Sequence, residues 1–595
     1  MLERKEIEEK YKWDTTKFCK DEKEFYKRLK AFEKNKDIIV KYEGKLKDDK
    51  VLLEGLKFED KVAEESAKLG VYAFLRQSED VRNSSVNEMA EEYERVTSEY
   101  GIASSFFDVE VCEFSDERLK NLINNPRFKD YKRGFENVLK KKKHTLSKKE
   151  EKLLSGMSFL GGFSSNFDKF DDGDLKFNKV SDSKGKLHEL NHSTYRELAE
   201  SKDVVLRKNT YVEFNGAYGR YINFLANNYI SDVKADCYFA KVRGYESALS
   251  ASIFNEEASV DVYNRLIRKI HENIDVFYDY MEIKRKMLGL NSISITDSFA
   301  PLTKAIPKKY TYDEAIELIK TAVAPLGEDY VKLIQRAKDE RWIDVYPNKG
   351  KDSGAYSIHA YGVTPMVLTN FTGNLESVFT LAHELGHALH SYYSMEKQNQ
   401  QNSDYVIFVA EVASTTNEML LMRYLMKNAT KKEELYYYLD RLFSDVKSTI
   451  YRQTMFSEFE ELTHAIYEKG EPLSKDRLCN EYYKLNEFYF GKKVKLVPEV
   501  KYEWARIPHF FRSFYVYKYA TGLICALNFS DKIFAGDTNA RDKYKEFLSA
   551  GSSDTPIKIL QNAGSDLESD EIFDEVFGYL RQQLVFWKKL GDSRR

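Results

Sequence analysis

Apolar residues recur at helical spacing among Lys and Glu over long stretches of this chain. Between residue 20 and about residue 130 the pattern is clearest in KEFYKRLKAFEKNKDIIVKYEGKLK and VNEMAEEYERVTSEYGIASSFFDVE. Wound as an α-helix, each segment has one apolar and one charged face, which predicts long amphipathic helices packed on one another. The 595 residues include only 10 Pro and 28 Gly, a composition that suits long helices with short connections. We therefore predict a mainly α fold.

Two segments depart from the helical pattern. Residues 161–190 contain Gly, Ser and Asp clusters with two short alternating runs, which indicates a small hairpin or an irregular loop. A chain of this length exceeds what one compact core usually supports, and we place a boundary here between an N-terminal helical lobe, residues 1–190, and a second domain, residues 191–595. Residues 341–375 are rich in Gly, Pro and β-branched residues and predict a few strands. Periodicity alone fits a buried structural strand and a free edge that binds an extended chain equally well.

Charge and cysteine content restrict the partners and the compartment. The 93 basic and 96 acidic residues are intermixed and leave a formal charge of −3, so no global field favours nucleic acid or a membrane surface. The 5 cysteines are scattered and form no C-x-x-C pair, which fits a reducing cytoplasm. The first residues, MLERKEIEEKYKWD, are charged where a signal peptide needs an apolar run. We expect a soluble cytoplasmic protein with no nucleic-acid or membrane partner, and its oligomeric state stays open.

The segment FTLAHELGHALHSYY contains two histidines four residues apart. With 10 His and 96 acidic residues, chance gives about 0.03 matches to H-[DE]-x-x-H in a chain of this length. On a helix, His383 and His387 share one face and can present imidazole nitrogens to one metal ion at about 2.0–2.1 Å. Glu384 lies about 100° round the helix, where it can take a proton from an attacking water. Gly386 allows another segment to come close.

A catalytic zinc ion normally has three protein ligands and one open position, so a third ligand is expected downstream. In DYVIFVAEVASTTNEMLLMRYLMK, Glu411 stands in an otherwise apolar helical stretch. Burial of an unpaired carboxylate is costly, and coordination removes that cost. Ser414 and Glu418 share its face and can orient ligands. The alternative for Glu411 is a partly exposed acid or an ion pair.

These motifs resemble the oligoendopeptidase F family, which is related to thimet oligopeptidase. The similar segments are HELGHALH, then FVAEVASTTNE with its Glu 28 positions after His383, and RIPHFFRSFYVYKYATG. Further similar segments, from EKYKWDTTKF to GAYSIHAYGVTPMVLTNFTGNLESVF, extend the resemblance over nearly the whole chain. It implies an elongated multi-helix zincin-type metallopeptidase with a small β-sheet beside the HExxH helix near residues 376–394, and a deep internal substrate channel.

The resemblance also implies an activity and a set of site residues. The activity is that of a zinc-dependent oligoendopeptidase, with one Zn²⁺ per chain, which hydrolyses internal bonds of short unstructured peptides in a catalytic domain formed by residues 191–595. By this resemblance the zinc ligands are His383, His387 and Glu411, and Glu384 is the general base. The late motif is similar to a His and Tyr segment that closes over substrate, and it contains His509, Tyr515, Tyr517 and Tyr519. A phenol or imidazole can donate a hydrogen bond to the oxyanion, and we assign His509 with Tyr519 first and Tyr517 next.

Two alternatives to this function remain. One is a zinc carboxypeptidase or dipeptidase on a related helical fold, which would read a terminal charge through Arg or Lys. The other is a non-catalytic helical peptide-binding protein with a structural metal. The presence of Glu384 and an open three-ligand set argues against the second alternative, because structural zinc is usually closed by four protein ligands.

Overall fold

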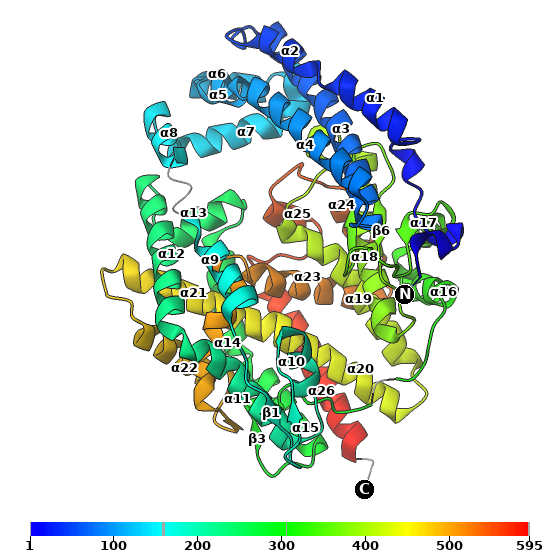
Figure 1. Ribbon diagram of the computed structural model, residues 1–595, viewed down its shortest axis with the longest axis vertical. Helices are drawn as coiled ribbons and strands as arrows, with labels where there is room; N and C mark the ends of the chain where they lie inside the picture. Colours follow the sequence, from blue (N-terminus) through cyan, green and yellow to red (C-terminus); the bar gives the residue numbers. More distant parts are fainter. Residues whose placement is uncertain (1, 157–160, 305, 593–595) are drawn as a thin grey trace. The chain divides into compact units, whose positions relative to one another are not determined.

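The computed structural model describes residues 2–156, 161–304 and 306–592. The chain divides into two compact units, each assembled from separated segments. The first unit contains Met1–Lys143, Pro307–Tyr424 and Phe529–Ser565, and the second contains His144–Ile306, Leu425–Asn528 and Asp566–Arg595. Both units are mainly α-helical, so the predicted fold class is confirmed (Figure 1).

The first unit begins with the predicted long amphipathic helices. Helices α1, α3 and α4, blue in Figure 1, contact one another through apolar faces. The α-helices that begin in this unit are α1 (Glu22–Phe32), α2 (Asn35–Ile39), α3 (Asp49–Glu79), α4 (Ser84–Ser104), α5 (Phe106–Cys112), α6 (Asp116–Ile123), α7 (Lys132–Lys141), α16 (Tyr312–Ala322), α17 (Glu328–Asp339), α18 (Leu375–Lys397), α19 (Ile407–Asn428), α24 (Thr538–Leu548) and α25 (Pro556–Asn562).

A three-stranded sheet in the first unit lies against α18. Its strands are β4 (Ile343–Asp344), β5 (Tyr356–Ile358) and β6 (Met366–Leu368) in the order β4-β6-β5. The central strand β6 is parallel to β4, antiparallel to β5, and fully buried, while β5 is a half-buried edge strand. Both β5 and β6 contact α18, so the predicted small sheet beside the HExxH helix is present.

Helix α18 extends three residues past the predicted range at its C-terminal end. Asn374 caps its start by accepting a hydrogen bond from the Ser377 backbone N–H at 2.8 Å. Just before the cap, Gly373 has φ +76°, and a Cβ there would lie 2.8 Å from the Tyr310 carbonyl oxygen. Only glycine suits that turn. The apolar face of α18 is buried through Phe379, Leu381, Ala382, Leu385, Ala388 and Leu389.

The second unit is a set of packed helices with two small pairs of strands. The antiparallel pair β1 (Val180–Ser181) and β2 (Leu187–His188) confirms the predicted hairpin within residues 161–190, and β3 (Ile293–Ser294) pairs in parallel with β7 (Val494–Lys495). The α-helices that begin here are α8 (Lys148–Gly156), α9 (Phe163–Lys169), α10 (His192–Ala199), α11 (Val204–Arg220), α12 (Ile222–Val242), α13 (Ala248–Asn255), α14 (Val260–Glu272), α15 (Ile274–Met287), α20 (Lys432–Asp445), α21 (Arg452–Glu468), α22 (Lys475–Phe490), α23 (Tyr517–Phe534) and α26 (Glu571–Asp592). Across the described residues, no helix has the length and apolar character needed to span a bilayer.

Candidate metal centre and active site

Helices α18 and α19 meet at Gly386. A Cβ at this position would lie 2.6 Å from the Cα of Ser414 and 2.9 Å from the carbonyl oxygen of Ala413, so a side chain larger than hydrogen has no room. Asn417 of α19 fixes the crossing, because its Nδ2 donates to the Ala382 carbonyl at 3.1 Å. The crossing brings Glu411, near the start of α19, over the histidine face of α18.

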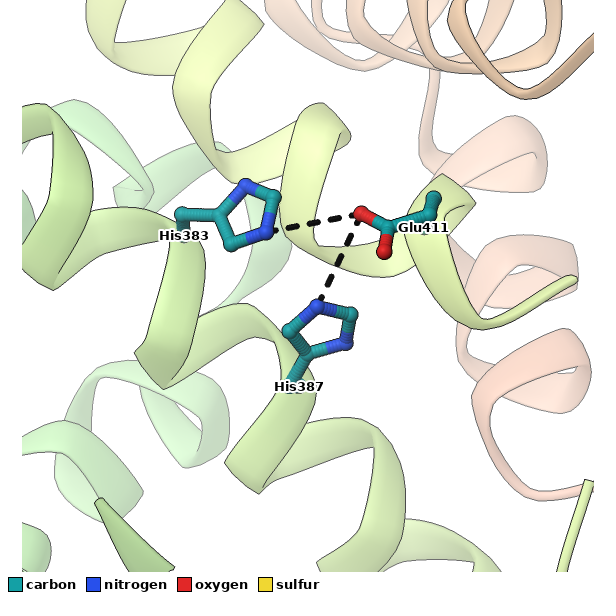
Figure 2. Close-up of side chains that lie close together, drawn as sticks. All are labelled: His383, His387 and Glu411. Carbon is teal, nitrogen blue, oxygen red and sulfur yellow. Dashed lines mark ion pairs between the residues drawn. The ribbon is translucent and has the colours of Figure 1, made fainter. Parts of the chain in front are cut away.

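Three ligand atoms converge at this crossing. The Nε2 atom of His383 lies 3.4 Å from Oε2 of Glu411, and the Nε2 atom of His387 lies 3.7 Å from the same oxygen. Figure 2 shows both imidazole rings turned towards that carboxylate. Tetrahedral ligands about 2.0–2.1 Å from one zinc ion are separated by about 3.3–3.4 Å. The three side chains therefore fit one shared metal ion.

The three side chains remain partly accessible. The exposed fractions are 25% for the side chain of His383, 18% for His387 and 37% for Glu411. Within the part of the chain that the structure describes, this is the only group of three or more His, Cys, Asp or Glu residues whose ligand atoms come so close together. Three protein ligands with solvent access match a catalytic site, since structural zinc is usually enclosed by four.

Two residues on the Glu411 face of α19, Ser414 and Glu418, form hydrogen bonds with the candidate ligands. Glu418 accepts a hydrogen bond from Nδ1 of His383 at 2.7 Å, which leaves Nε2 directed at Glu411. Ser414 donates to the Glu411 carboxylate at 3.3 Å. Burial lowers the pKa of His383, but the hydrogen bond to Glu418 and the neighbouring carboxylates outweigh it and raise that pKa to about 9. Burial and the charge of His383 lower the pKa of His387 to about 3, so His387 keeps a nitrogen lone pair for a metal.

Glu384 stands beside this group in a more enclosed environment. The residue is only 6% exposed. Burial raises the pKa of Glu384 to about 7, and the charges of Glu411 and Glu418 act in the same direction against the opposing effect of His383. A carboxyl group with a pKa near 7 both accepts and releases protons at neutral pH. Its environment therefore suits acid and base chemistry.

One supporting residue was not found from the sequence. Asn417 connects three helices, since it also accepts a hydrogen bond from the hydroxyl of Tyr330 in α17 at 2.9 Å. The signal available in the sequence is a polar run, Thr415 to Asn417, inside an otherwise apolar helix. Buried polar side chains of this kind need partners, and here the partners are the neighbouring helices.

In the second unit, the late motif places three of the predicted aromatic residues together. His509 lies on the short 3₁₀ helix η14 (Pro508–Phe511), and Tyr519 lies in the first turn of α23. The ring of His509 is 6.0 Å from that of Tyr519 and 6.3 Å from that of Tyr515. Tyr517 is not part of this group, because it is fully buried and its hydroxyl donates to Glu256 at 2.9 Å. The geometry thus favours Tyr519 over Tyr517 as a partner of His509.

Most of the chain matches known peptidases. Residues 197–579 match the family model for Peptidase family M3, and residues 110–177 match the model for Oligopeptidase F. The chain belongs to peptidase family M3. The predicted resemblance to oligoendopeptidase F is confirmed, and the chain is a metallo-endopeptidase, a hydrolase of peptide bonds.

Relatives within family M3 align with this chain over nearly its full length. Oligopeptidase PepF of Bacillus subtilis (strain 168) is 36% identical, over 96% of this chain and 85% of its own length. An oligoendopeptidase F homolog of Lactococcus lactis subsp. lactis is 33% identical over 99% of both chains. Among solved structures, a putative peptidase from Chlamydophila abortus is 32% identical, covers 99% of this chain and 100% of its own, and has a TM-score of 0.94.

A second similar solved structure is named as an oligoendopeptidase F. Oligoendopeptidase-F from Enterococcus faecium is 27% identical, with a TM-score of 0.73, over 96% of this chain and 99% of its own. Membership of this metallopeptidase family implies a divalent metal ion. The group formed by His383, His387 and Glu411 provides a fitting donor set for it.

Proposed function

We propose that this chain is a zinc-dependent oligoendopeptidase in which His383, His387 and Glu411 hold one zinc ion and Glu384 is the general base. The observation that carries the proposal is the convergence of the three ligand atoms within 4.8 Å of one another beside the buried Glu384 carboxyl group. Two imidazoles and one carboxylate form a donor set typical of catalytic zinc.

The proposed chemistry uses Glu384 twice. Zinc, when bound, polarises the scissile carbonyl and lowers the pKa of the attacking water towards about 7. Glu384 takes the proton from that water and then delivers it to the leaving amine. Glu418 orients the ring of His383 through the hydrogen bond to Nδ1, so Nε2 is the nitrogen available to a metal ion.

We further propose that His509 and Tyr519 supply hydrogen-bond donors to the oxyanion of the tetrahedral intermediate. Their rings lie 6.0 Å apart, His509 is exposed and Tyr519 is partly exposed, so both side chains are accessible to a ligand. Donors placed in advance for the developing charge stabilise the transition state more than the ground state. Tyr517 is the weaker candidate because its hydroxyl already binds Glu256.

Substrate length, domain boundary and location complete the proposal. A narrow substrate channel would exclude folded proteins and restrict the enzyme to short unstructured peptides. We keep the predicted boundary of the N-terminal lobe at residue 190 because the two family models lie on either side of it, whereas the compact units divide the chain after Lys143. A cytoplasmic location is supported by five cysteines that all remain unpaired, namely Cys19, Cys112, Cys237, Cys479 and Cys525.

Two substitutions test the division of roles. Glu384→Ala is expected to retain zinc but to lose about 10²- to 10⁴-fold in turnover, because only the proton-transfer group is removed. Glu411→Ala is expected to lose affinity for zinc, because a ligand is removed. Metal analysis of the purified wild type and both variants, with peptide cleavage assayed in parallel, checks both expectations and identifies the ion. Equal loss of metal in the two variants would refute the assignment.

A further inference from the structure

A single strained residue lies between the two segments that carry His509 and Tyr519. Phe514 has φ +60°, a left-handed conformation that is unfavourable for a bulky residue. It lies between the 3₁₀ helix that carries His509 and the helix that carries Tyr519. The backbone angles of Phe514, which we call the joint, therefore determine how His509 is placed relative to Tyr519. Strain of this kind persists only where surrounding contacts enforce it.

One of those contacts comes from a buried acid on α21. The backbone N–H of Phe514 donates to Oε1 of Glu460 at 2.9 Å, and Glu460 has no exposed surface. Burial raises the pKa of Glu460 well above its ordinary value. The contact with Phe514 is made through a side-chain acceptor oxygen. Glutamine preserves that acceptor in the same position.

Neighbouring contacts hold the rest of the joint. The ring of His464, one turn after Glu460 on α21, lies 4.6 Å from the ring of Phe514. The preceding carbonyl, that of Ser513, accepts a hydrogen bond from the hydroxyl of Ser252 at 3.2 Å. Phe514 is itself only 1% exposed. Within this set, Glu460 alone binds the backbone of the strained residue directly.

We propose that Glu460 is a positioning residue for catalysis, which holds Phe514 in its left-handed conformation and so aligns His509 with Tyr519. This inference rests on the proposed oxyanion role of His509 and Tyr519. Glu460 acts through the backbone and does not touch the substrate. Its loss should therefore reduce transition-state stabilisation while it leaves peptide binding and the metal group intact.

The test compares variants that keep or remove the acceptor. Glu460→Met, similar in volume but without a strong acceptor, is expected to lower kcat about tenfold to hundredfold with KM within about twofold, since a misplacement of about 1 Å costs rates of this order. Affinity for a phosphinic peptide that mimics the tetrahedral oxyanion should fall by the same factor as kcat/KM. Glu460→Gln should have kcat, KM and inhibitor affinity close to those of the wild type. The same is expected of Glu461→Met, the matched control one residue along α21.

Several results would overturn the positioning role of Glu460. A folded Glu460→Met with wild-type kcat and inhibitor affinity would overturn it, as would a rise in KM without a fall in kcat. If Glu460→Met does not fold, Glu460→Asp replaces it, because the shorter side chain withdraws the acceptor by one methylene group. The same fall in kcat and in inhibitor affinity is then expected of Glu460→Asp. His509→Ala tests the underlying proposal separately. If His509→Ala is impaired and Glu460→Met is not, only this inference fails, whereas an unimpaired His509→Ala refutes the oxyanion role itself.

Discussion

Replacement of Gly386 by alanine is expected to damage the metal centre without touching a ligand. The added Cβ would lie 2.6 Å from the Cα of Ser414, whereas carbon atoms in contact are normally about 3.5–4.0 Å apart. Because the obstacle is backbone, α18 and α19 must separate by about 1 Å. Overpacking of this kind costs about 1–3 kcal/mol of folding free energy, and the better helix propensity of alanine offsets about 0.5–1 kcal/mol of that.

The same shift moves Glu411 away from the histidines. Metal–ligand distances tolerate deviations of about 0.2 Å, so Gly386→Ala should weaken metal binding by about tenfold or more, comparable with the loss of a ligand-orienting partner. Chelator competition measures the affinity, and thermal unfolding with and without metal measures the stability. Gly101→Ala is the matched control, since a Cβ there meets no atom within 4 Å and should leave metal affinity unchanged. A Gly386→Ala protein with wild-type affinity and stability would refute this account of the helix crossing.

Two further substitutions probe other parts of the structure. Glu418→Ala should lower metal affinity about 10- to 100-fold by chelator competition, because His383 loses the partner that fixes its ring; an unchanged affinity would exclude an orienting role. Glu503 in the second unit is buried, and although burial itself raises its pKa, the charges of Arg452 and Arg506 outweigh burial and lower it to about 2 from the ordinary 4.5. The folded-state pKa is depressed, so the stabilisation is complete above about pH 4.5 and is lost as pH falls through about 2. Glu503→Gln should lower the free energy of unfolding by about 3–5 kcal/mol near neutral pH. Urea unfolding should show that the difference from the wild type becomes smaller in acid. A difference that does not change with pH would contradict the ion pair as its cause.

The sequence predicted the features that depend on local patterns. The helix that carries His383 and His387 follows from apolar periodicity, and the spacing of the two histidines places them on one face. Glu411 was identifiable because an acid in an apolar helix needs a partner. Glu418 was identifiable because it lies seven residues later on the same helix face, and its carboxylate accepts a hydrogen bond from His383.

Features that depend on distant contacts were not predictable in this way. The first unit combines segments as far apart as Lys143 and Pro307, and it is defined by contacts between segments that are distant in the sequence. Similarly, three tyrosines at alternate positions after residue 514 look alike in the sequence. Tyr517 differs from Tyr519 in being fully buried, with its hydroxyl donating to Glu256, 261 residues earlier in the chain. The left-handed conformation of Phe514 could not be predicted from the sequence either, because a phenylalanine does not indicate a positive φ.

The most direct test of the central claim is digestion of a short unstructured peptide, with the products read by mass spectrometry. Wild type and Glu384→Ala are compared with and without chelator, and Zn²⁺ is added back. We predict internal cuts by the wild type only, abolished by chelator and restored by Zn²⁺. Cleavage by Glu384→Ala at the wild-type rate, or cleavage that survives complete removal of metal, would contradict the account, and trimming from the termini alone would contradict endopeptidase action.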